Sequence, residues 1–258
     1  MPEILSGWFT DRMTGRAEAG GQVTWIFDRF GARFPYDVLV AEPPARLLLK
    51  GNPVGRPPYH LEILIGAGEG GGTTIEIVNS GFMTGSRGTG SDGAGSREAG
   101  ADDEFEGVVS GWQMALAILT RYLERHHGQP RESFFAMQPA RFDYEAIRPY
   151  FQDPKLLSRW LTRSGGIGAT GTSIRLELFD GSTLSGEVLA VTSREAAISW
   201  SEINGILELK AFQLSPLQRA VCLRGSGWGL SGDEAARVEK SMAEAIDRLV
   251  EALNGERS

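Results

Sequence analysis

Two glycine motifs are the first candidates for chemistry in this chain. The segments 66–71 and 166–171 both fit the spacing G-x-G-x-x-G, which in dinucleotide-binding proteins leads into a helix whose N-terminus meets a pyrophosphate. Here each motif leads into an alternating apolar segment, residues 73–79 and 173–179, and this alternation predicts a strand. We therefore predict that both motifs are hairpin turns. The P-loop spacing G-x-x-x-x-G-K-[ST] does not occur.

Residues that bind metals or act as nucleophiles are few. His126 and His127 follow one another at the end of a predicted helix, where an imidazolium would interact favourably with the helix dipole. Adjacent helical residues do not share a face, so we do not expect these two to bind a metal together. Cys222 lies in an apolar run, which predicts a small buried side chain in a strand more than a reactive thiol. We predict no metal site and no cofactor.

Acid–base catalysis would require carboxylates that face an interior. Asp28, Glu62 and Glu76 alternate with apolar neighbours, so we predict that they lie on the outer, solvated face of their strands. No serine stands in the spacing G-x-S-x-G. The sequence thus offers no recognisable catalytic constellation, and we expect a binding protein more than an enzyme.

Composition narrows the range of partners. The chain has 258 residues, of which 41% are hydrophobic and 23% charged, with a net charge of -7. Because no basic stripe is visible, nucleic acid is not an expected partner. No apolar run approaches the length of about 18 residues that spans a membrane. The first ten residues do not resemble a signal peptide, so we expect a cytoplasmic location.

The elements that would hold a site are strands followed by one long helix. Apolar and polar residues alternate over residues 23–27, 59–65 and 74–79, as is typical of strands with one buried face. The glycine- and serine-rich residues 84–101 are expected to be flexible. A helix with one apolar stripe is predicted over about residues 104–124.

The same order of elements begins again in the second half. A strand is predicted at residues 133–137, then a helix over residues 143–161 interrupted near Pro149 and Pro154, then further strands and a final helix over residues 233–253. Ser80-Gly81-Phe82 resembles Ser226-Gly227-Trp228, and each precedes the last helix of its half. We therefore predict two domains of one design, residues 1–130 and residues 131–258.

Several motifs of the first half resemble a known superfamily. They are Trp8-Phe9-Thr10, Glu42-Pro43-Pro44-Ala45-Arg46-Leu47, Gly72-Thr73-Thr74 through Ser80-Gly81-Phe82, and Gly111-Trp112 with Leu116, Leu119 and Tyr122-Leu123. Their order resembles the START-like, or SRPBCC, superfamily, and within it the group named for the activator of the heat-shock-protein-90 ATPase. The resemblance covers most of residues 4–126, while the second half matches only in outline and lacks both the Glu-Pro-Pro and the Gly-Trp pair.

The resemblance implies an α+β fold with two helix-grip domains, in each of which a curved antiparallel sheet wraps a long C-terminal helix. Family domains open with a strand and a helix before the segment that matches Trp8-Phe9-Thr10. The first copy has only residues 1–7 ahead of that segment, so we expect its sheet to lack the opening strand. A sheet edge that lacks its neighbouring strand favours association with another chain. One expectation is therefore a homo-oligomer formed through this edge.

We expect the chain to bind a hydrophobic small molecule, or a partner, in a cavity between sheet and helix. The candidate pocket residues are Trp8, Trp25, Phe27, Tyr59, Phe82, Trp112 and Leu116. Ordinary core packing is the alternative for most of them. Two other functions stay open at this point: a polyketide cyclase/aromatase-like enzyme, and a cochaperone-like protein-interaction module.

Overall fold

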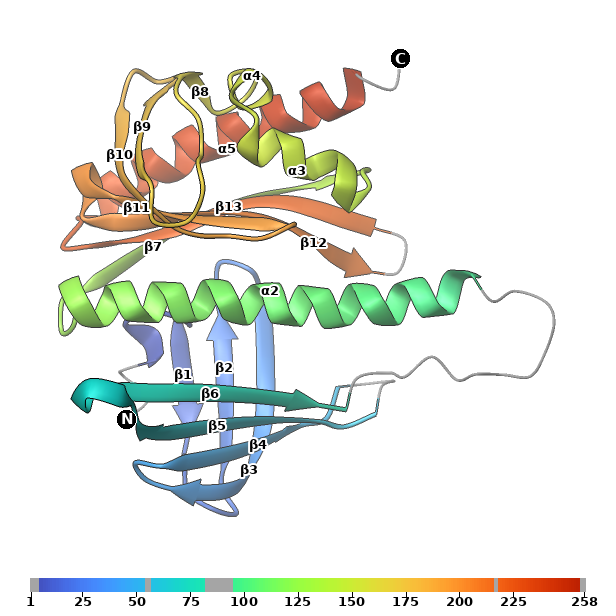
Figure 1. Cartoon of the computed structure of the whole chain (residues 1–258), viewed down its shortest axis with the longest axis vertical. Coiled ribbons are helices and arrows are strands. Elements are labelled where there is room, and N and C mark those ends of the chain that lie inside the picture. The colour runs from blue at the N-terminus through green and yellow to red at the C-terminus, as the bar shows by residue number, and fades with distance from the viewer. Residues whose placement is uncertain (1–4, 54–56, 82–94, 216–217, 256–258) are drawn as a thin grey trace. The chain divides into compact units, whose positions relative to one another are not determined.

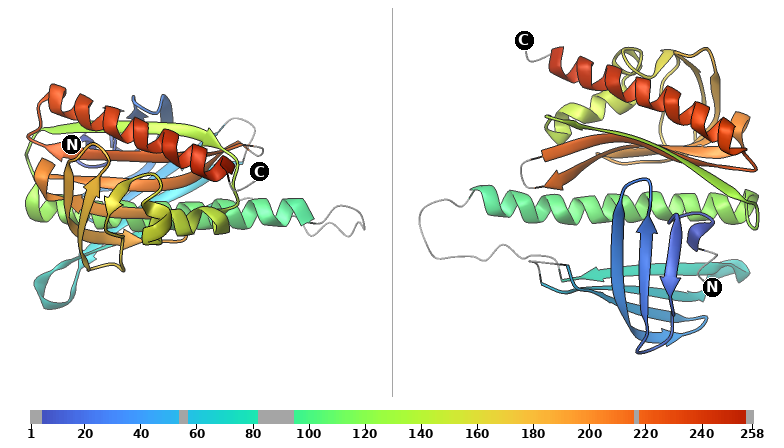
Figure 2. Two further views of the ribbon diagram at one scale, coloured as in Figure 1. Left: turned by 90° about the horizontal axis from the view of Figure 1, so that it is seen from above. Right: turned by 180° about the vertical axis from the view of Figure 1, so that it is seen from behind.

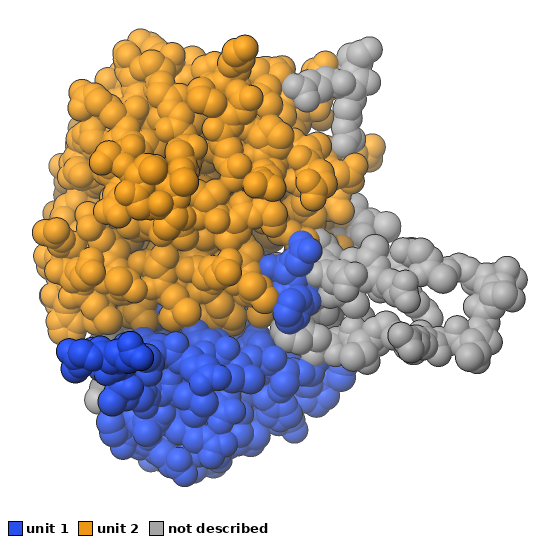
Figure 3. Space-filling view, viewed as in Figure 1, with its two compact units in different colours: residues 1–106 blue, residues 107–258 orange. Residues whose placement is uncertain are grey.

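The chain forms two compact units, Met1–Glu106 and Gly107–Ser258 (Figure 3). The computed structural model describes residues 5–53, 57–81, 95–215 and 218–255, with the backbone alone for residues 95–104 and 215. The long helix α2 (Gly95–Arg125) crosses the division between the units. The assignment of residues 1–130 to one domain and 131–258 to another stays a prediction.

The first unit is built on a six-stranded antiparallel sheet in which the strands follow one another in chain order (Figure 1). The strands are β1 (Arg12–Gly15), β2 (Gln22–Phe27), β3 (Ala32–Glu42), β4 (Arg46–Gly51), β5 (Tyr59–Ala67) and β6 (Thr73–Ser80). The Gly66–Gly71 motif lies in the hairpin between β5 and β6, which includes the short 3₁₀ helix η1 (Glu69–Gly71), so the predicted hairpin turn is confirmed. The turn predicted at Pro43-Pro44 joins β3 to β4.

One face of this first sheet carries its apolar side chains. Cross-strand pairing places Val38, Leu49 and Leu61 in one row, and each is at most 1% exposed. On the opposite face Arg12 forms a two-bonded ion pair with Asp28, at 2.6 and 2.7 Å. The predicted alternation of a buried and a solvated face therefore holds here, because successive strand residues point to opposite sides.

Helix α2 is longer than the sequence predicts. The expected start was near residue 104, whereas the helix begins at Gly95, so the expectation of a flexible segment is wrong for residues 95–101. The rest of that segment, residues 84–94, lies outside the described residues. The end agrees with the prediction: Arg125 is the last helical residue and Gly128 follows with φ of +78°, a conformation that glycine adopts without strain.

The second unit holds a seven-stranded antiparallel sheet in the order β7-β13-β12-β11-β10-β9-β8. Its strands are β7 (Arg131–Ala140), β8 (Thr162–Ser164), β9 (Ser173–Leu178), β10 (Thr183–Val191), β11 (Glu195–Trp200), β12 (Gly205–Ser215) and β13 (Gln218–Trp228). The helices are α3 (Tyr144–Gln152), α4 (Pro154–Leu157) and α5 (Gly232–Gly255), with the 3₁₀ helix η2 (Ser201–Ile203) between β11 and β12. The Gly166–Gly171 motif lies in the turn between β8 and β9, again as predicted.

Helix α5 lies along the inner face of this second sheet, as both views show (Figures 1 and 2). Its residues Met242, Ile246 and Leu249 belong to one buried apolar cluster that also contains residues of β7, β9 to β13 and helices α3 and α4. A curved antiparallel sheet packed on a long C-terminal helix is the helix-grip arrangement that the resemblance implies. The predicted α+β fold class is confirmed.

The predicted interruption in the helix over residues 143–161 occurs at one proline only. Pro149 lies inside α3 without ending it. The break falls at Asp153, whose side chain accepts hydrogen bonds from the backbone of Lys155 at 2.7 Å and Leu156 at 3.4 Å and so caps α4.

Both faces of the central strands of the second sheet are covered. All six residues of β11 are buried. Within the second unit, α2 contributes to this cover on the outer face: Ser110 contacts Thr192 after β10, and His126, which follows α2, stacks on Trp228 of β13.

The two sheets differ at one edge. In the second sheet, β7 pairs with β13, the strand that precedes α5. In the first sheet, β6 precedes α2 and ends the strand order, and no described strand pairs with its other side. No helix among the described residues is long and apolar enough to cross a membrane.

Candidate functional site

The largest group of contacting aromatic rings in the first unit lies on the inner face of its sheet. A helical turn before β1 supplies Trp8 and Phe9, whose ring centroids lie 5.1 Å apart. Phe9 then contacts Trp25 and Phe27 of β2, each edge-to-face at 5.5 Å. Such edge-to-face pairs are favoured by the charge distribution of the rings. The turn is thereby fixed against β2.

The cluster continues across β3 to β5. Tyr36 lies 4.8 Å from Trp25 between ring centroids, and Phe34 lies 5.8 Å from Phe27. Tyr59 of β5 meets Tyr36 edge-to-face at 5.9 Å. We call the connected set the aromatic cluster, and it comprises Trp8, Phe9, Trp25, Phe27, Phe34, Tyr36 and Tyr59.

Tyr36 and Tyr59 belong to strands that are not neighbours, and a glycine lets them meet. Gly51 of β4 is the cross-strand partner of both tyrosines. A Cβ atom at Gly51 would lie 2.4 Å from the ring of Tyr59. The missing side chain thus leaves the space through which the Tyr59 ring reaches across β4.

The two tyrosine hydroxyls form the polar part of the aromatic cluster. Tyr59 donates a hydrogen bond of 3.1 Å to the hydroxyl of Tyr36. Burial raises the pKa of Tyr36 above its ordinary value of 10.0. The Tyr36 phenol is therefore neutral at physiological pH and can take part in hydrogen bonds.

Most rings of the aromatic cluster keep some exposed surface. Trp25 and Tyr36 are each 6% exposed, whereas Phe34 is 39% exposed and the remaining members are half-buried. A second polar group lies on the same face, since Asn79 of β6 pairs with Leu61 and its side-chain oxygen is buried with no hydrogen-bond partner among the described residues. An apolar surface with a few polar groups is the usual lining of a small-molecule site.

The structure brings together four of the predicted pocket residues. Trp8, Trp25, Phe27 and Tyr59 all belong to the aromatic cluster. Phe82 lies outside the described residues. Trp112 and Leu116 are half-buried on the part of α2 that belongs to the second unit. Whether any of these residues binds a ligand stays a prediction.

Three members of the aromatic cluster are not among the pocket residues predicted from the sequence. Phe9 stands beside Trp8 and was passed over as part of a motif. Phe34 and Tyr36 alternate along β3 with Val38, which is a period-2 signal that could have been found. Their contact with residues of β2 and β5 depends on strand pairing, which no local pattern reports.

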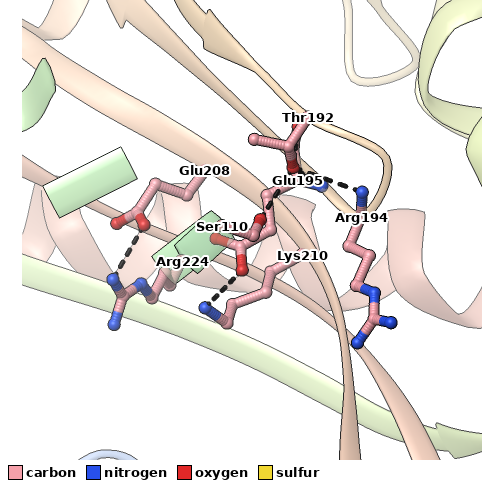
Figure 4. A network of polar contacts seen from close by, with 7 residues as sticks. All are labelled: Ser110, Thr192, Arg194, Glu195, Glu208, Lys210 and Arg224. Carbon is pink, nitrogen blue, oxygen red and sulfur yellow. Dashed lines mark hydrogen bonds and ion pairs between the residues drawn. The ribbon is translucent and has the colours of Figure 1, made fainter. Parts of the chain in front are cut away.

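Several charged and polar side chains lie together on the outer face of the second sheet (Figure 4). Glu195 of β11 pairs with Lys210 of β12 at 2.8 Å, and Glu208 of β12 pairs with Arg224 of β13 at 2.8 Å. Both pairs are direct cross-strand partners. Burial of Arg224 opposes its charge, but the neighbouring Glu208 carboxylate outweighs this effect and raises the pKa of Arg224 above its ordinary value.

This charged group is enclosed, which favours a structural role. Glu195 is 3% and Glu208 6% exposed. Beside them, the hydroxyl of Thr192 lies 2.7 Å from that of Ser110 and accepts hydrogen bonds from the backbone of Glu195 and Arg194. Charges buried to this extent persist because they are paired.

His126 corrects one expectation. Its ring stacks on Trp228 with centroids 4.0 Å apart and planes 5° from parallel. Burial, and then the nearby charges of Arg121 and Arg125, lower the pKa of His126 to about 4. The expected imidazolium at the helix end is therefore wrong, because the cost of burying the charge exceeds the attraction of the helix dipole.

The remaining candidates for chemistry are structural. Cys222 on β13 is 2% exposed, and burial raises the pKa of its thiol to about 12. It is thus a buried strand residue, as the sequence predicts. In the part of the chain that the structure describes, no three metal-ligating side chains gather at one place.

No protein-family model matches the chain, and no curated protein matches its sequence. Among solved structures, the chain is similar to the Aha1 dimer from Colwellia psychrerythraea, at 17% identity and a TM-score of 0.41 over 47% of this chain and 96% of that chain. It is similar to the di-domain ARO/CYC StfQ from the steffimycin biosynthetic pathway, at 12% identity and a TM-score of 0.42 over 99% of this chain and 92% of that chain. A third is protein MLL2253 from Mesorhizobium loti, at 15% identity and a TM-score of 0.42 over 48% of this chain and 98% of that chain. Likenesses of this strength carry no information on ligand or activity.

Proposed function

We propose that this protein binds an apolar small molecule with an aromatic part against the aromatic cluster of the first unit. The observation that carries the proposal is a continuous set of rings from the turn before β1 to β5, of which Phe34 and the half-buried members keep exposed surface. Aromatic rings of a ligand would stack or pack edge-to-face on these side chains.

The polar groups on the same face restrict the chemistry of the ligand. The Tyr36 hydroxyl can donate a hydrogen bond to a ligand carbonyl or hydroxyl, and the Tyr59 hydroxyl, whose hydrogen is donated to Tyr36, can accept one from a ligand hydroxyl. A neutral ligand with one or two oxygen functions fits this surface better than a carboxylate or an amine.

We infer that the two units are copies of one START-like design. Strands β1 to β6 follow one another in the first sheet as β8 to β13 do in the second, and a long helix follows the last strand of each set. The copies differ in their interiors. The second is filled by large buried side chains such as Trp160, Tyr150 and Phe134, so we assign ligand binding to the first.

A fluorescence titration with N-phenyl-1-naphthylamine, a neutral aromatic probe, tests the proposal. We expect saturable binding that Phe34→Ala weakens about threefold to tenfold, because one edge-to-face contact is lost. Leu214→Ala is the matched control, since Leu214 is a 36%-exposed apolar residue of the second unit, and it should leave the affinity unchanged. Native mass spectrometry of protein purified from its host would show whether a small molecule is retained.

Two results would overturn this function. One is the absence of saturable probe binding to the intact chain. The other is an equal loss of affinity in Phe34→Ala and Leu214→Ala, which would place the probe on general apolar surface.

A second candidate is a polyketide cyclase/aromatase-like enzyme, which the neutral Tyr36 phenol favours. The Tyr36 phenol can donate a hydrogen bond to a ketone oxygen of the substrate and so polarise that carbonyl toward attack by another carbon of the same chain. The test is the rate at which a synthetic poly-β-ketone thioester cyclises with and without the protein. Acceleration that Tyr36→Phe abolishes, while probe affinity is kept, would support catalysis. A cyclisation rate with the wild-type protein that equals the rate without protein would exclude this enzymatic function.

A further inference from the structure

The described sheets have four edge strands, and three of them are protected against pairing with another chain. Strand β1 has four residues and ends at Gly15, and β8 has three residues and an irregular register. Short or irregular edges cannot template a long ladder. Strand β7 is long, but it contains Pro139, which has no amide hydrogen to donate.

Strand β7 has an additional form of protection. Glu239 of α5 accepts a hydrogen bond of 3.0 Å from the backbone amide of Phe135. A helix carboxylate thus occupies a backbone donor in the middle of this edge strand. The second sheet is therefore closed to partners along β7.

Strand β6 is the exception. Its eight residues, Thr73–Ser80, include no proline, lysine, arginine or glycine, and Glu76 is their single charge. Every ladder partner recorded for β6 comes from β5, on one side. On the outer face Val78 is 40% exposed. A long regular edge of this kind is suited to accept another strand.

In the second sheet the strand that corresponds to β6 is paired on both sides. Strand β13, which stands before α5 as β6 stands before α2, pairs with β7 along ten residues, from Trp228 with Arg131 to Arg219 with Ala140. That pairing is antiparallel. The same position beside β6 has no described strand.

We propose that β6 pairs antiparallel with β6 of a second copy of this chain, so that two first sheets form one continuous sheet. A second copy fits because β6 is complementary to itself. An antiparallel pair of identical strands is related by a two-fold axis, which gives a closed dimer.

The faces of the sheet restrict the register of this pair. Ile75, Ile77 and Asn79 lie on the inner, half-buried face, and the residues between them lie on the exposed face. A continuous sheet requires inner residues opposite inner residues, so only every second register is allowed. Two of the allowed registers pair seven residues of each strand. In one of them Glu76 lies opposite Glu76 of the other copy, and in the other Ile77 lies opposite Ile77 of the other copy.

Charge decides between the two registers. Centring on Glu76 places two carboxylates directly opposite each other, which is destabilising. Centring on Ile77 places Glu76 opposite Val78 of the other copy and Thr74 opposite Ser80 of the other copy. The proposed dimer therefore has Ile77 on its two-fold axis.

Sedimentation velocity across a dilution series of the full chain tests the dimer and its register together. We expect the wild type to dissociate reversibly on dilution. Val78→Lys should lower the dissociation constant about twofold to tenfold, because it creates two Glu–Lys pairs across the interface. Glu76→Lys combined with Val78→Lys should raise it by about tenfold or more, because lysine then faces lysine. Both side chains are exposed, so thermal melts should show that the monomer fold is kept.

A disulfide provides direct evidence for the register. Thr74→Cys mixed with Ser80→Cys should give a cross-linked heterodimer under mild oxidation, while either variant alone should not. Glu177→Lys, a substitution by lysine at an exposed position of β9, is the control for the lysine variants and should leave the dimer unchanged. A monomeric wild type at every concentration overturns the proposal. So does a dimer that Val78→Lys weakens as much as the double variant, or a mixture that fails to cross-link.

Discussion

The hydroxyl of Tyr59 on β5 donates a hydrogen bond of 3.1 Å to the hydroxyl of Tyr36 on β3, across the intervening strand β4. The contact exists because Gly51, which pairs with both tyrosines, has no side chain to keep the Tyr59 ring away. One glycine thereby lets Tyr59 join the aromatic cluster and positions the two hydroxyl groups of the cluster.

The first prediction concerns this glycine. Gly51→Ala should displace the Tyr59 ring, since the new Cβ would lie 2.4 Å from it. Loss of the hydrogen bond and of ring packing should lower the free energy of unfolding by about 2 kcal/mol. Urea denaturation followed by near-ultraviolet circular dichroism would measure both the loss and the altered tyrosine environment.

A control for Gly51→Ala is available on the next strand. A Cβ at Gly66 would meet only the hydroxyl of Thr74 at 3.3 Å, which is the end of a side chain that can rotate. Gly66→Ala should cost less than Gly51→Ala. Equal costs would mean that the penalty comes from the general loss of glycine in a strand.

The second prediction is a pH dependence of stability that arises from His126. Its pKa is about 4 in the folded chain and has the ordinary value of 6.5 when exposed. Above pH 6.5 the His126 ring is neutral in both the folded and the unfolded chain, so its titration does not lower the free energy of unfolding. As the pH falls from 6.5 toward 4, the unfolded state takes up a proton that the folded state does not, so stability decreases by about 2 to 3 kcal/mol.

His126→Phe isolates this contribution, because phenylalanine can keep the stack on Trp228 without titrating. The difference in unfolding free energy between the variant and the wild type should grow in favour of the variant below pH 6.5. Nuclear magnetic resonance titration of the His126 ring would give its pKa directly. A ring that titrates near 6.5 in the folded protein would contradict the prediction.

The third prediction concerns the buried ion pair of Glu208 and Arg224. Glu208→Gln leaves the guanidinium of Arg224 without its carboxylate in a largely buried place, and should cost about 2 to 4 kcal/mol of unfolding free energy. Glu208→Gln combined with Arg224→Met removes both charges and should cost less than the single change. A double-mutant cycle by chemical denaturation measures the coupling, and additive costs would show that the pair contributes no net interaction.

The fourth prediction uses Cys222 as a reporter of unfolding. Because the thiol is buried and its pKa is raised to about 12, it should not react with Ellman's reagent in the folded protein at neutral pH. In denaturant the reaction should be fast and complete. Rapid labelling under native conditions would show that β13 opens locally.

Several local features of the fold could be predicted from the sequence because each depends on neighbours in the chain. The glycine-rich motifs are hairpin turns since both lead into alternating apolar residues, and the burial of residues along β6 and β9 follows this alternation. The end of α2 near Gly128 is likewise a local property of glycine. Period-2 alternation determines that a residue faces one side of a sheet, and this requires no knowledge of the partner strand.

Only the tertiary structure decided what lies against each face. Four predicted pocket residues meet in the aromatic cluster, but the cluster depends on Gly51 standing opposite Tyr36 and Tyr59, which is a matter of strand register. All six residues of β11 are buried, so side chains on both of its faces are covered. The dipole argument for His126 failed since Trp228, about a hundred positions further along the chain, buries the ring. Side-chain direction is a local consequence of backbone geometry, whereas burial, pKa and pairing depend on residues that are distant in sequence.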